Sequence, residues 1–418
     1  MATRGAHLLK ADRTFATGGG LLGRLAAPAF RRVIEQLHAR LRHGGIHGTL
    51  PSGEQRRVGF HARGPEPVVH LHSWLALVRL ATSGSVGWYK AWERGEWSSP
   101  DPVPLFELFM LNAESLGGTA RAKGPFRLIN LLAHQWRDNA PRQARENIAA
   151  HYDLGNDFYA AWLDPTMTYS SALFEGPGDE LQSAQLRKIH RLLDRLRIKP
   201  GDTLLEIGCG WGTLAMEAAK RGAIVTGLTL STEQKDWAER RIADAGAADR
   251  ITIRLEDYRD HRECYDALAS VEMVEAVGER WWPTYLDSIG TALRPGGRAA
   301  LQFIAIRPEL FSRYAASADF IQTYIFPGGM LLHEPHFAAL AAERGLSWED
   351  RDGFSLHYAE TLRLWRQRYE AAVGDGRLPG FDGRFHDLWR YYLMYCEGGF
   401  RGGGIDVAQV TLTKKEPS

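Results

Sequence analysis

The spacing of hydrophobic and polar residues changes several times along the chain, and each change predicts a different element. In residues 21–43, Leu and Ile recur at helical spacing with arginines between them, which predicts a basic amphipathic helix. Residues 57–80 carry β-branched and alternating stretches instead, and a Gly/Ser turn follows them at 83–87. These patterns predict a small mixed α/β N-terminal domain over residues 1–116.

After residue 146 the pattern becomes a regular alternation of strand-like and helical runs. Such an alternation indicates an α/β fold in which a parallel sheet has helices on both faces. The chain shows no internal repeat and no low-complexity tract. The runs are, in order, a helix at 184–197, a strand and turn at 203–212, a helix at 213–221, and strands at 223–228, 266–271 and 298–306.

Composition places the chain among ordinary globular proteins. Its 418 residues suffice for two or three domains, and 44% hydrophobic with 24% charged residues excludes disorder and a fibrous protein. Three scattered cysteines support neither a disulfide framework nor a zinc site, which favours a reducing cytoplasm. The sequence contains no apolar run of ~18 residues and no recognisable signal peptide, so we expect a soluble or peripheral protein.

Charge is balanced overall but uneven along the chain. The 51 basic and 50 acidic residues nearly cancel, which argues against a nucleic-acid binder. Residues 1–50 hold eight basic and two acidic residues, a net charge of +6, so the remainder carries −5. A basic linker is expected at 117–146, where six basic residues outnumber two acidic ones. Both segments suit an anionic membrane surface, although solvated arginines on a docked helix or a connector fit the same pattern.

The most specific chemical signal is the turn Gly-Cys-Gly-Trp-Gly at 208–212. It follows an apolar strand, and ligands of open α/β sheets bind at the carboxyl ends of strands. Glu206, two residues earlier, can accept hydrogen bonds from an amino group of a ligand. The turn is neither the GxGxxG of dinucleotide enzymes nor a phosphate-binding GxxxxGK sequence, so phosphate binding is the weaker interpretation.

Together with VTGLTLSTEQ at 225–234, this turn resembles class I S-adenosylmethionine-dependent methyltransferases. Five further segments narrow the resemblance to the cyclopropane fatty acid synthase and mycolic acid methyltransferase family, over about residues 145–415. It implies a Rossmann-like seven-stranded sheet with helices on both faces over residues 147–418. The stretch at 84–97 is similar to the lipid-handling N-terminal domain of the family's longer members. The five segments are HYDLGNDFYAAWLDPTMTYSSALF (151–174), SVEMVEAVGERWWPTY (270–285), YIFPGGML (324–331), HYAETLRLW (357–365) and YYLMYCEGGFRGGGID (391–406).

The resemblance also implies which residues contact S-adenosylmethionine. Tyr169 and Ser170 are expected at its methionine end, and Gly208 and Gly210 would allow its close approach. Glu206 joins the cofactor-binding residues as the acceptor for an amino group described above. A plain solvent-exposed role is the alternative for two of the remaining residues, Gln234 and Glu256. The residues expected on the ribose side are Thr229, Leu230 and Gln234, and those expected near the adenine are Glu256 and Asp257.

The substrate that the resemblance implies is a cis double bond in an acyl chain. Methyl transfer to such a bond leaves a carbocation, and a bound bicarbonate would then remove a proton so that a cyclopropane closes. The resemblance implies that Glu275 and Tyr358 hold this anion through their side chains, Ile304 through its backbone, and that Cys396 belongs to the same cluster. We assign no nucleophilic role to Cys396.

Two positions of the expected anion cluster depart from the family pattern. Ser171 stands where many members have cysteine, and its backbone amide can still donate a hydrogen bond. Gln302 stands where histidine is common, and an amide cannot carry a proton's charge as an imidazole does. If the proton is not removed promptly, a hydride shift would give a methyl- or methylene-branched chain instead.

We therefore expect a methyltransferase that acts on the cis double bond of an unsaturated phospholipid acyl chain and forms a cyclopropane fatty acid. The alternatives are a fatty-acid C-methyltransferase that makes a branched chain, and a non-catalytic lipid-binding protein with a methyltransferase fold. The expected partners are phospholipid acyl chains, an anionic membrane surface and, as a candidate, a second copy of the chain in a homodimer. We expect no nucleic acid and no metal. The expected location is the cytoplasm, in transient contact with the inner face of the membrane.

Overall fold

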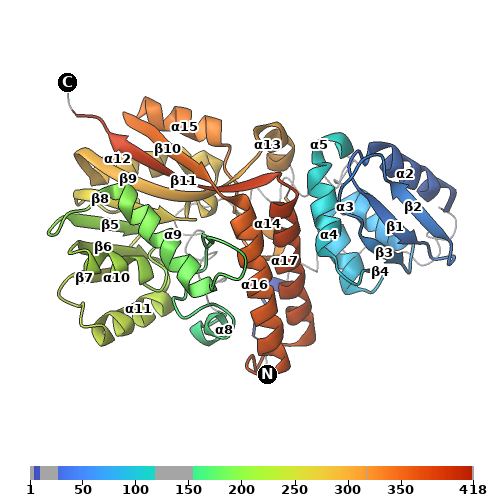
Figure 1. The fold of residues 1–418 in the computed structure, drawn as a ribbon, viewed down its shortest axis with the longest axis horizontal. Coiled ribbons are helices and arrows are strands. Elements are labelled where there is room, and N and C mark those ends of the chain that lie inside the picture. The colour runs from blue at the N-terminus through green and yellow to red at the C-terminus, as the bar shows by residue number, and fades with distance from the viewer. Residues whose placement is uncertain (1–3, 10–26, 118–153, 317, 417–418) are drawn as a thin grey trace. The chain divides into compact units, whose positions relative to one another are not determined.

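The computed structural model describes residues 4–9, 27–117, 154–316 and 318–416 (Figure 1). The chain forms two compact units, and each is made of separate segments. The domain boundaries expected near residues 116 and 146 stay a prediction, since residues 118–153 lie outside the described part. The first unit contains Met1–Arg137, Glu309–Pro327 and Pro379–Ile405, and the second contains Asp138–Pro308, Gly328–Leu378 and Asp406–Ser418.

The second unit is built on a seven-stranded sheet with the order β10-β11-β9-β8-β5-β6-β7. From β9 to β7 neighbouring strands are parallel, whereas β10 pairs antiparallel with β11 at the opposite edge. The central strands are runs of buried apolar residues, as expected of parallel strands covered on both faces. The strands are β5 Thr203–Ile207, β6 Ile224–Thr229, β7 Ile251–Leu255, β8 Tyr265–Val271, β9 Leu293–Ile306, β10 Leu346–Gly353 and β11 Ile405–Lys414.

Helices cover both faces of this sheet, which confirms the α/β fold expected from the sequence. Helices α9 (Leu181–Leu196), α10 (Thr213–Lys220) and α11 (Thr232–Asp244) share one hydrophobic core with β5 to β9. On the other face α12 (Trp282–Ala292) contacts β8 and β9, and α15 (Glu334–Glu343) contacts β10 (Figure 1). The helix α9 follows from its sequence, because its buried residues recur at helical spacing along one side. Two more helices carry site residues, α8 (Asn156–Ala160) and α16 (Ser355–Gly374).

The first unit contains a four-stranded sheet with the order β2-β1-β3-β4 and a set of helices. The helix expected at 21–43 is confirmed for α2, whereas residues 21–26 lie outside the described part. Strands form only part of the stretch 57–80, since the helix α3 (Leu75–Glu93) already begins within it. The strands are β1 Gly45–Thr49, β2 Gln55–Gly59, β3 Val68–Leu71 and β4 Trp97–Ser98; the helices are α2 Ala27–Arg40, α3 Leu75–Glu93, α4 Val103–Leu111, α5 Ala113–Leu116, α13 Pro308–Ala315, α14 Phe320–Tyr324 and α17 Gly383–Arg401.

Two glycines of the first unit allow α17 and its C-terminal end to approach α4 closely. A Cβ on Gly398 would lie 2.5 Å from Cβ of Phe106, and one on Gly402 would lie 2.6 Å from Cβ of Met110. Real Cβ atoms do not come so close, so only glycine permits this packing. The C-terminal segment is thereby joined to the helices of residues 103–116.

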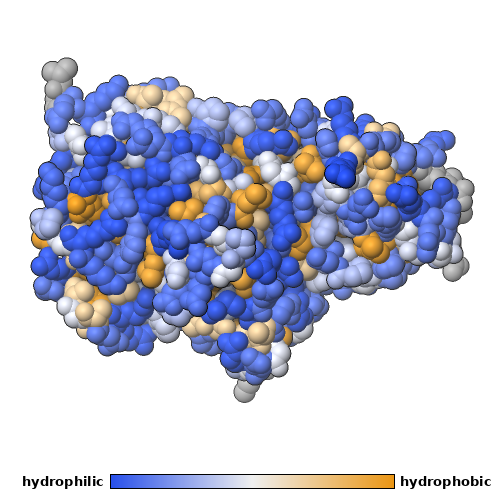
Figure 2. All heavy atoms as spheres, viewed as in Figure 1, coloured by the Kyte–Doolittle hydropathy of each residue, from blue (hydrophilic) through white to orange (hydrophobic). Residues whose placement is uncertain are grey.

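The molecular surface in the view of Figure 2 is mostly hydrophilic, with scattered hydrophobic residues between the polar ones. Within the described ranges, no helix combines the length and the apolar character needed to cross a membrane.

Candidate active site

The ends of the parallel strands bring the predicted site residues of the second unit to one edge of the sheet. The register pairs Glu206 of β5 with Gly227 of β6, and Val271 of β8 with Gln302 of β9. Thr229 is the last residue of β6. Because open α/β sheets bind ligands beyond the carboxyl ends of their strands, the site of this unit is expected at this edge.

The turn after β5 is shaped by glycines. Gly208 and Gly210 have φ angles of 80° and 52°, in the left-handed region that glycine adopts without steric cost. The N–H groups of Gly208 and Cys209 donate to the carbonyl of Leu228 at 3.0 and 2.9 Å, which ties the turn to β6. A Cβ on Gly208 would lie 3.2 Å from Cγ of Met273. This open backbone is what the predicted close approach of a cofactor requires.

A buried polar cluster lies around Ser170. Gln185 donates from Nε2 to the carbonyl of Ser170 at 2.8 Å, and Nζ of Lys188 donates to its hydroxyl at 2.6 Å. Three buried acceptor atoms have no hydrogen-bond partner among the described residues: Oδ1 of Asp164, Oε1 of Gln185 and Oε2 of Glu206. Orphaned buried acceptors of this kind fit an ammonium group such as that of S-adenosylmethionine.

Burial dominates the electrostatics of this cluster. It raises the pKa of Glu206 to about 8, against the backbone N–H of Ala215 and the charge of Lys188. Burial also lowers the pKa of Lys188 to about 8, against the charges of Glu272, Asp164 and Glu206. A bound cationic ligand would favour the ionised form of Glu206, because an opposite charge nearby stabilises a carboxylate.

Tyr169 belongs to an aromatic cluster on the same side. Its ring centroid lies 5.5 Å from Tyr159, 5.6 Å from Trp162 and 5.2 Å from Trp365. Trp162 and Trp365 are fully buried. These rings form an apolar wall beside Ser170, and such a wall excludes water from a reacting group.

The three residues predicted on the ribose side lie together at the end of β6. Thr229 donates from its hydroxyl to Oε1 of Gln234 at 2.9 Å. Ser231 caps α11, since its hydroxyl accepts from the N–H of Gln234 at 3.2 Å. Leu230 between them is half-buried. The cap therefore fixes the direction in which this group of side chains is presented.

The carboxylates of Glu256 and Asp257, after β7, are engaged by their own segment. Oε1 of Glu256 lies 3.0 Å from Nδ1 of His261. Asp257 is buried and accepts two bonds from the guanidinium group of Arg259, at 2.9 and 2.7 Å, and a third from its backbone N–H at 3.0 Å. The N–H of Glu256 donates to the carbonyl of Thr229 at 3.1 Å, which places both residues beside the ribose-side group. Their contact with an adenine stays a prediction.

A second cluster lies at the ends of β8 and β9, and its centre is Glu272, a residue that the sequence analysis did not select. The N–H of Ser171 and Nε2 of Gln302 donate to its Oε1 at 2.9 and 2.8 Å. The hydroxyl of Tyr358 donates to its Oε2 at 2.7 Å. Three of the residues expected to hold a bicarbonate thus hold a carboxylate of the protein itself.

The backbone at Glu272 is in a conformation that side chains rarely adopt. Its φ of 49° lies in the left-handed region, which is unfavourable for any residue with a Cβ. Its N–H donates to the carbonyl of Gln302 at 2.7 Å, which fixes the residue against β9. A signal was present in the sequence, because Glu272 and Glu275 stand three residues apart directly after a buried strand, but only Glu275 matched the family pattern.

Glu275 is placed beside this cluster by backbone hydrogen bonds. Its Oε1 accepts from the N–H of Ile304, and its carbonyl accepts from the N–H of Met330 at 2.7 Å. Its Oε2 is buried without a partner in the described part of the chain. Burial, and then the charge of Glu272, raise the pKa of Glu275 to about 8.

The two glutamates therefore compete for one negative charge. Burial raises the pKa of Glu272 as well, but the hydrogen bond from Tyr358, the charge of Lys188 and the bond from Ser171 all oppose this rise. Neighbouring carboxyl groups do not both ionise easily. The three donors favour the negative charge on Glu272, and the raised pKa of Glu275 favours a proton there.

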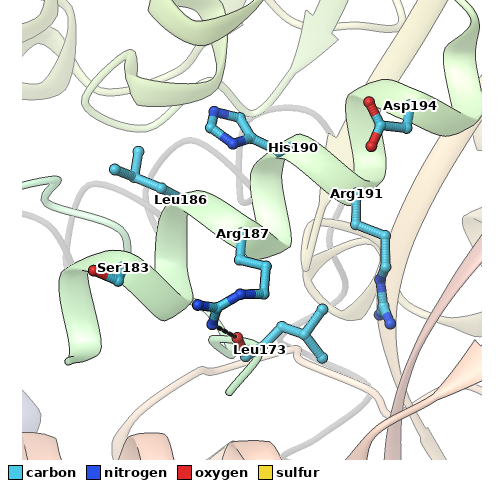
Figure 3. A pocket seen from close by; sticks show the side chains of 7 residues that line it. All are labelled: Leu173, Ser183, Leu186, Arg187, His190, Arg191 and Asp194. Carbon is cyan, nitrogen blue, oxygen red and sulfur yellow. Dashed lines mark hydrogen bonds between the residues drawn. The ribbon is translucent and has the colours of Figure 1, made fainter. Parts of the chain in front are cut away.

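Gln302 is held in its orientation by a second buried glutamine. Nε2 of Gln409 donates to Oε1 of Gln302 at 3.0 Å, and Nε of Arg191 donates to Oε1 of Gln409 at 2.9 Å. This series of hydrogen bonds connects Glu272 to Arg191 of α9. Arg191 also lines a groove of about 570 Å³ (Figure 3). The groove is lined by Leu173, Ser183, Leu186, Arg187, His190, Arg191 and Asp194.

Cys396 lies on α17, in the first unit, whereas the other residues of the expected anion cluster belong to the second. Burial raises the pKa of its thiol, so it is protonated at neutral pH. Its membership of the anion cluster stays a prediction.

Comparison with known proteins now identifies the family. The sequence matches the family model described as mycolic acid cyclopropane synthetase over residues 139–410. The chain belongs to this family. It is a S-adenosylmethionine-dependent methyltransferase, and its relatives are enzymes of fatty-acid and mycolic-acid modification.

Individual relatives of this methyltransferase carry different names. It is 40% identical over 364 residues to the tuberculostearic acid methyltransferase of Mycobacterium tuberculosis, covering 85% of this chain and 84% of that protein. It is 33% identical over 358 residues to the cyclopropane-fatty-acyl-phospholipid synthase of Escherichia coli, covering 80% and 85%. Both names refer to a fatty acid or to a fatty-acyl lipid.

Solved structures agree with this assignment. The crystal structure of a mycolic acid cyclopropane synthase complexed with SAH and CTAB has a TM-score of 0.61 and 33% identity, and covers 65% of this chain and 98% of that one. A coclaurine N-methyltransferase structure, at 20% identity and a TM-score of 0.59, shows the same fold. The SAH complex supports S-adenosylmethionine as the cofactor of this enzyme.

Proposed function

We propose that this enzyme methylates the cis double bond of an unsaturated phospholipid acyl chain and releases a methylene-branched chain. The observation that carries the proposal is the carboxylate of Glu272, bound by Ser171, Gln302 and Tyr358. In our proposal Glu272 is the base that the family resemblance assigns to a bicarbonate. The names of two relatives, which refer to tuberculostearic acid and to a fatty-acyl phospholipid, support an acyl lipid as the acceptor.

When bound, S-adenosylmethionine supplies a methyl group to one carbon of the double bond and leaves as S-adenosylhomocysteine, so that the other carbon becomes a cation. A hydride then moves from the methylated carbon to its neighbour, and the positive charge moves to the methylated carbon. Glu272 takes a proton from the methyl group, and the electrons of that C–H bond form the methylene double bond. The lipid has gained one CH₂, and Glu272 returns its proton to solvent before the next turnover.

The hydrogen bonds to Glu272 favour this order of events. A carboxylate has about four lone-pair sites, and three of them here accept bonds from donors. Each bond stabilises the ionised form and so makes the base weaker. A weaker base leaves time for the hydride shift before the proton is lost. A saturated methyl branch would need a further reduction and is not part of the proposal.

A cyclopropane is the second candidate product, and the match of Glu275, Ile304 and Tyr358 to the family pattern favours it. It would form if the proton left the methyl group before the hydride shift, because the freed electron pair would then close the ring on the cation. Both products have the same mass and differ only in the position of their bonds.

We further propose that the reaction takes place at an anionic membrane surface, which a cytoplasmic enzyme contacts transiently. Exposed arginines of α2, of the residues directly after it and of β2 support this, since basic side chains near such a surface contribute about 1 kcal/mol each. The attraction should weaken as salt is added. The arginines are Arg32, Arg40, Arg42, Arg56 and Arg57.

The test is an assay of the product. The purified enzyme is incubated with methyl-labelled S-adenosylmethionine and liposomes of a cis-monounsaturated phospholipid, and the fatty acids are analysed by mass spectrometry and proton NMR. We expect a gain in mass of one CH₂ together with olefinic methylene signals. Upfield ring-proton signals would assign the reaction to the second candidate. Binding of the cofactor without any labelled lipid would refute both.

A further inference from the structure

Lys188 is a fully buried cation inside the site. Its relative exposure is 0%, and its ammonium donates to the hydroxyl of Ser170 at 2.6 Å. A buried ammonium is unfavourable unless nearby negative charges compensate it. The carboxylates that do so are those of Glu272, Asp164 and Glu206, with Glu272 contributing most. The cation is thus held in place by acidic side chains from both clusters described above.

The side chain of Lys188 reaches Glu272 through two consecutive serines. Its ammonium binds the hydroxyl of Ser170, and the N–H of the next residue, Ser171, donates to Oε1 of Glu272 at 2.9 Å. The ammonium is thus bonded to the loop residue next to the one that donates to Glu272.

The backbone of Lys188 is also connected to the carboxylate of Glu272, through Gln409 and Gln302. Its carbonyl accepts from Nε2 of Gln409 at 3.2 Å, and the same nitrogen donates to Gln302 at 3.0 Å. Gln302 in turn donates to Glu272 at 2.8 Å. One residue of α9 thus supports two of the three donors that hold the carboxylate.

We propose that Lys188 is a positioning residue that keeps Glu272 ionised and aligned for proton removal. This inference rests on the proposed role of Glu272 as the base. An ammonium charge close to a carboxylate favours its ionised form, and after catalysis it favours release of the captured proton. The remaining titratable groups that face Glu272 in the described structure are Glu275, after β8, and Tyr358 of α16.

The test uses two changes at Lys188 and one matched control. Lys188→Met removes the charge and the hydrogen bond, whereas Lys188→Gln removes the charge and keeps a donor for Ser170. Lys199→Met is the control, since Lys199 is an exposed lysine shortly after the same helix. We expect the acidic limb of the kcat profile to move up by about one pH unit or more in both Lys188 variants. Lys199→Met should keep the original profile. A Lys188→Gln enzyme with the original profile would overturn the inference.

A second readout separates this inference from the proposed function. Infrared difference spectroscopy follows the protonated carboxyl band, which is assigned to Glu272 by its loss in Glu272→Gln. We expect the titration midpoint of Glu272 to rise in Lys188→Gln. An unchanged midpoint overturns the role of Lys188. If the titration midpoint of Glu272 rises but the acidic limb of the kcat profile stays where it was, the role of Lys188 is supported and Glu272 is refuted as the base. The unaltered enzyme offers a test without any substitution. In it Glu272 must titrate at a lower pH than Glu275, and the reverse order overturns the inference.

Discussion

Removal of the Glu272 side chain tests the proposed base directly. In Glu272→Gly the N–H of Ser171, the amide of Gln302 and the hydroxyl of Tyr358 would face the volume that the carboxylate now fills. Those three donors are arranged to hold a small carboxylate-like anion. We therefore expect Glu272→Gly to lose activity and bicarbonate in the buffer to restore part of it.

The structure sets the size of both effects. Loss of a positioned general base costs about 10²- to 10⁴-fold in rate. Each buried donor left without an acceptor costs about 1–3 kcal/mol of unfolding free energy. Part of this loss is offset, because glycine adopts the φ of 49° at this position without strain, a gain of about 1 kcal/mol. Three such donors, less this gain, give a net stability loss of about 2–8 kcal/mol, and we expect a folded variant toward the lower end of this range.

The assay measures labelled lipid formed by Glu272→Gly over a range of bicarbonate concentrations, with chloride at equal ionic strength for comparison. The rescue should saturate, as binding to a defined site does. Glu279→Gly is the control, because this glutamate follows in the same segment with a side chain that is 41% exposed. If the folded Glu272→Gly enzyme binds the cofactor but bicarbonate restores nothing, or if it keeps full activity, the reasoning is wrong. Adding Gln302→His to Glu272→Gly should tighten the rescue, since a protonated imidazole donates a charge-assisted bond.

Three further results follow from the geometry. Tyr358→Phe removes the hydroxyl bond to Glu272, so kcat should fall about tenfold and the acidic limb of its pH profile should rise; an unchanged profile would show that this bond does not tune the carboxylate. Glu275 has a pKa of about 8 in the folded protein against 4.5 as its ordinary value, so its stabilising contribution is full below pH 4.5 and is lost as the pH rises through 8. Between pH 5 and 8 the Tm of Glu275→Gln should therefore fall by about 3 °C less than the Tm of the unaltered enzyme. Thermal unfolding of both proteins at both pH values measures this, and equal falls in Tm would contradict it. Gly208→Ala would place a Cβ 3.2 Å from Met273 at a φ of 80°, so calorimetry should show at least about tenfold weaker S-adenosylmethionine binding, and unaltered affinity would count against close approach of the cofactor there.

Local patterns were sufficient to predict the elements that surround the glycine turn. The strand over 203–207 is an apolar run that ends in glycines, and α9 repeats its buried residues at helical spacing, so both were visible in short windows of sequence. The return of residues 379–405 to the first unit was not visible in this way. It depends on the approach of α17 to α4 at Gly398 and Gly402, which involves residues almost 300 positions apart.

The candidate site, like the fold, could be predicted from the sequence only in part. Ser171, Gln302 and Tyr358 were predicted to act together from family resemblance, and the structure brings them together. What they bind could not be read from their identities, because a bound bicarbonate and the carboxylate of Glu272 need the same donors. Which carboxylate these donors hold depends on the backbone of Glu272, which is in the left-handed conformation. With this backbone the side chain of Glu272 meets the donors, whereas Glu275 accepts its bond from the N–H of Ile304. Lys188 was missed because a lysine on an amphipathic helix is usually taken to face solvent.

The proposed base, the carboxylate of Glu272, is part of the chain itself, and this changes what the proposed reaction depends on outside the protein. A dissolved anion occupies its site only in proportion to its concentration, whereas a tethered group is present at a fixed, high effective concentration. The three donors of the site are therefore satisfied whatever the supply of dissolved inorganic carbon. With Glu272 as the base, as proposed, a cell that carries this enzyme would continue to modify its lipids when carbon dioxide is scarce. An enzyme that takes a dissolved anion as its base would slow down.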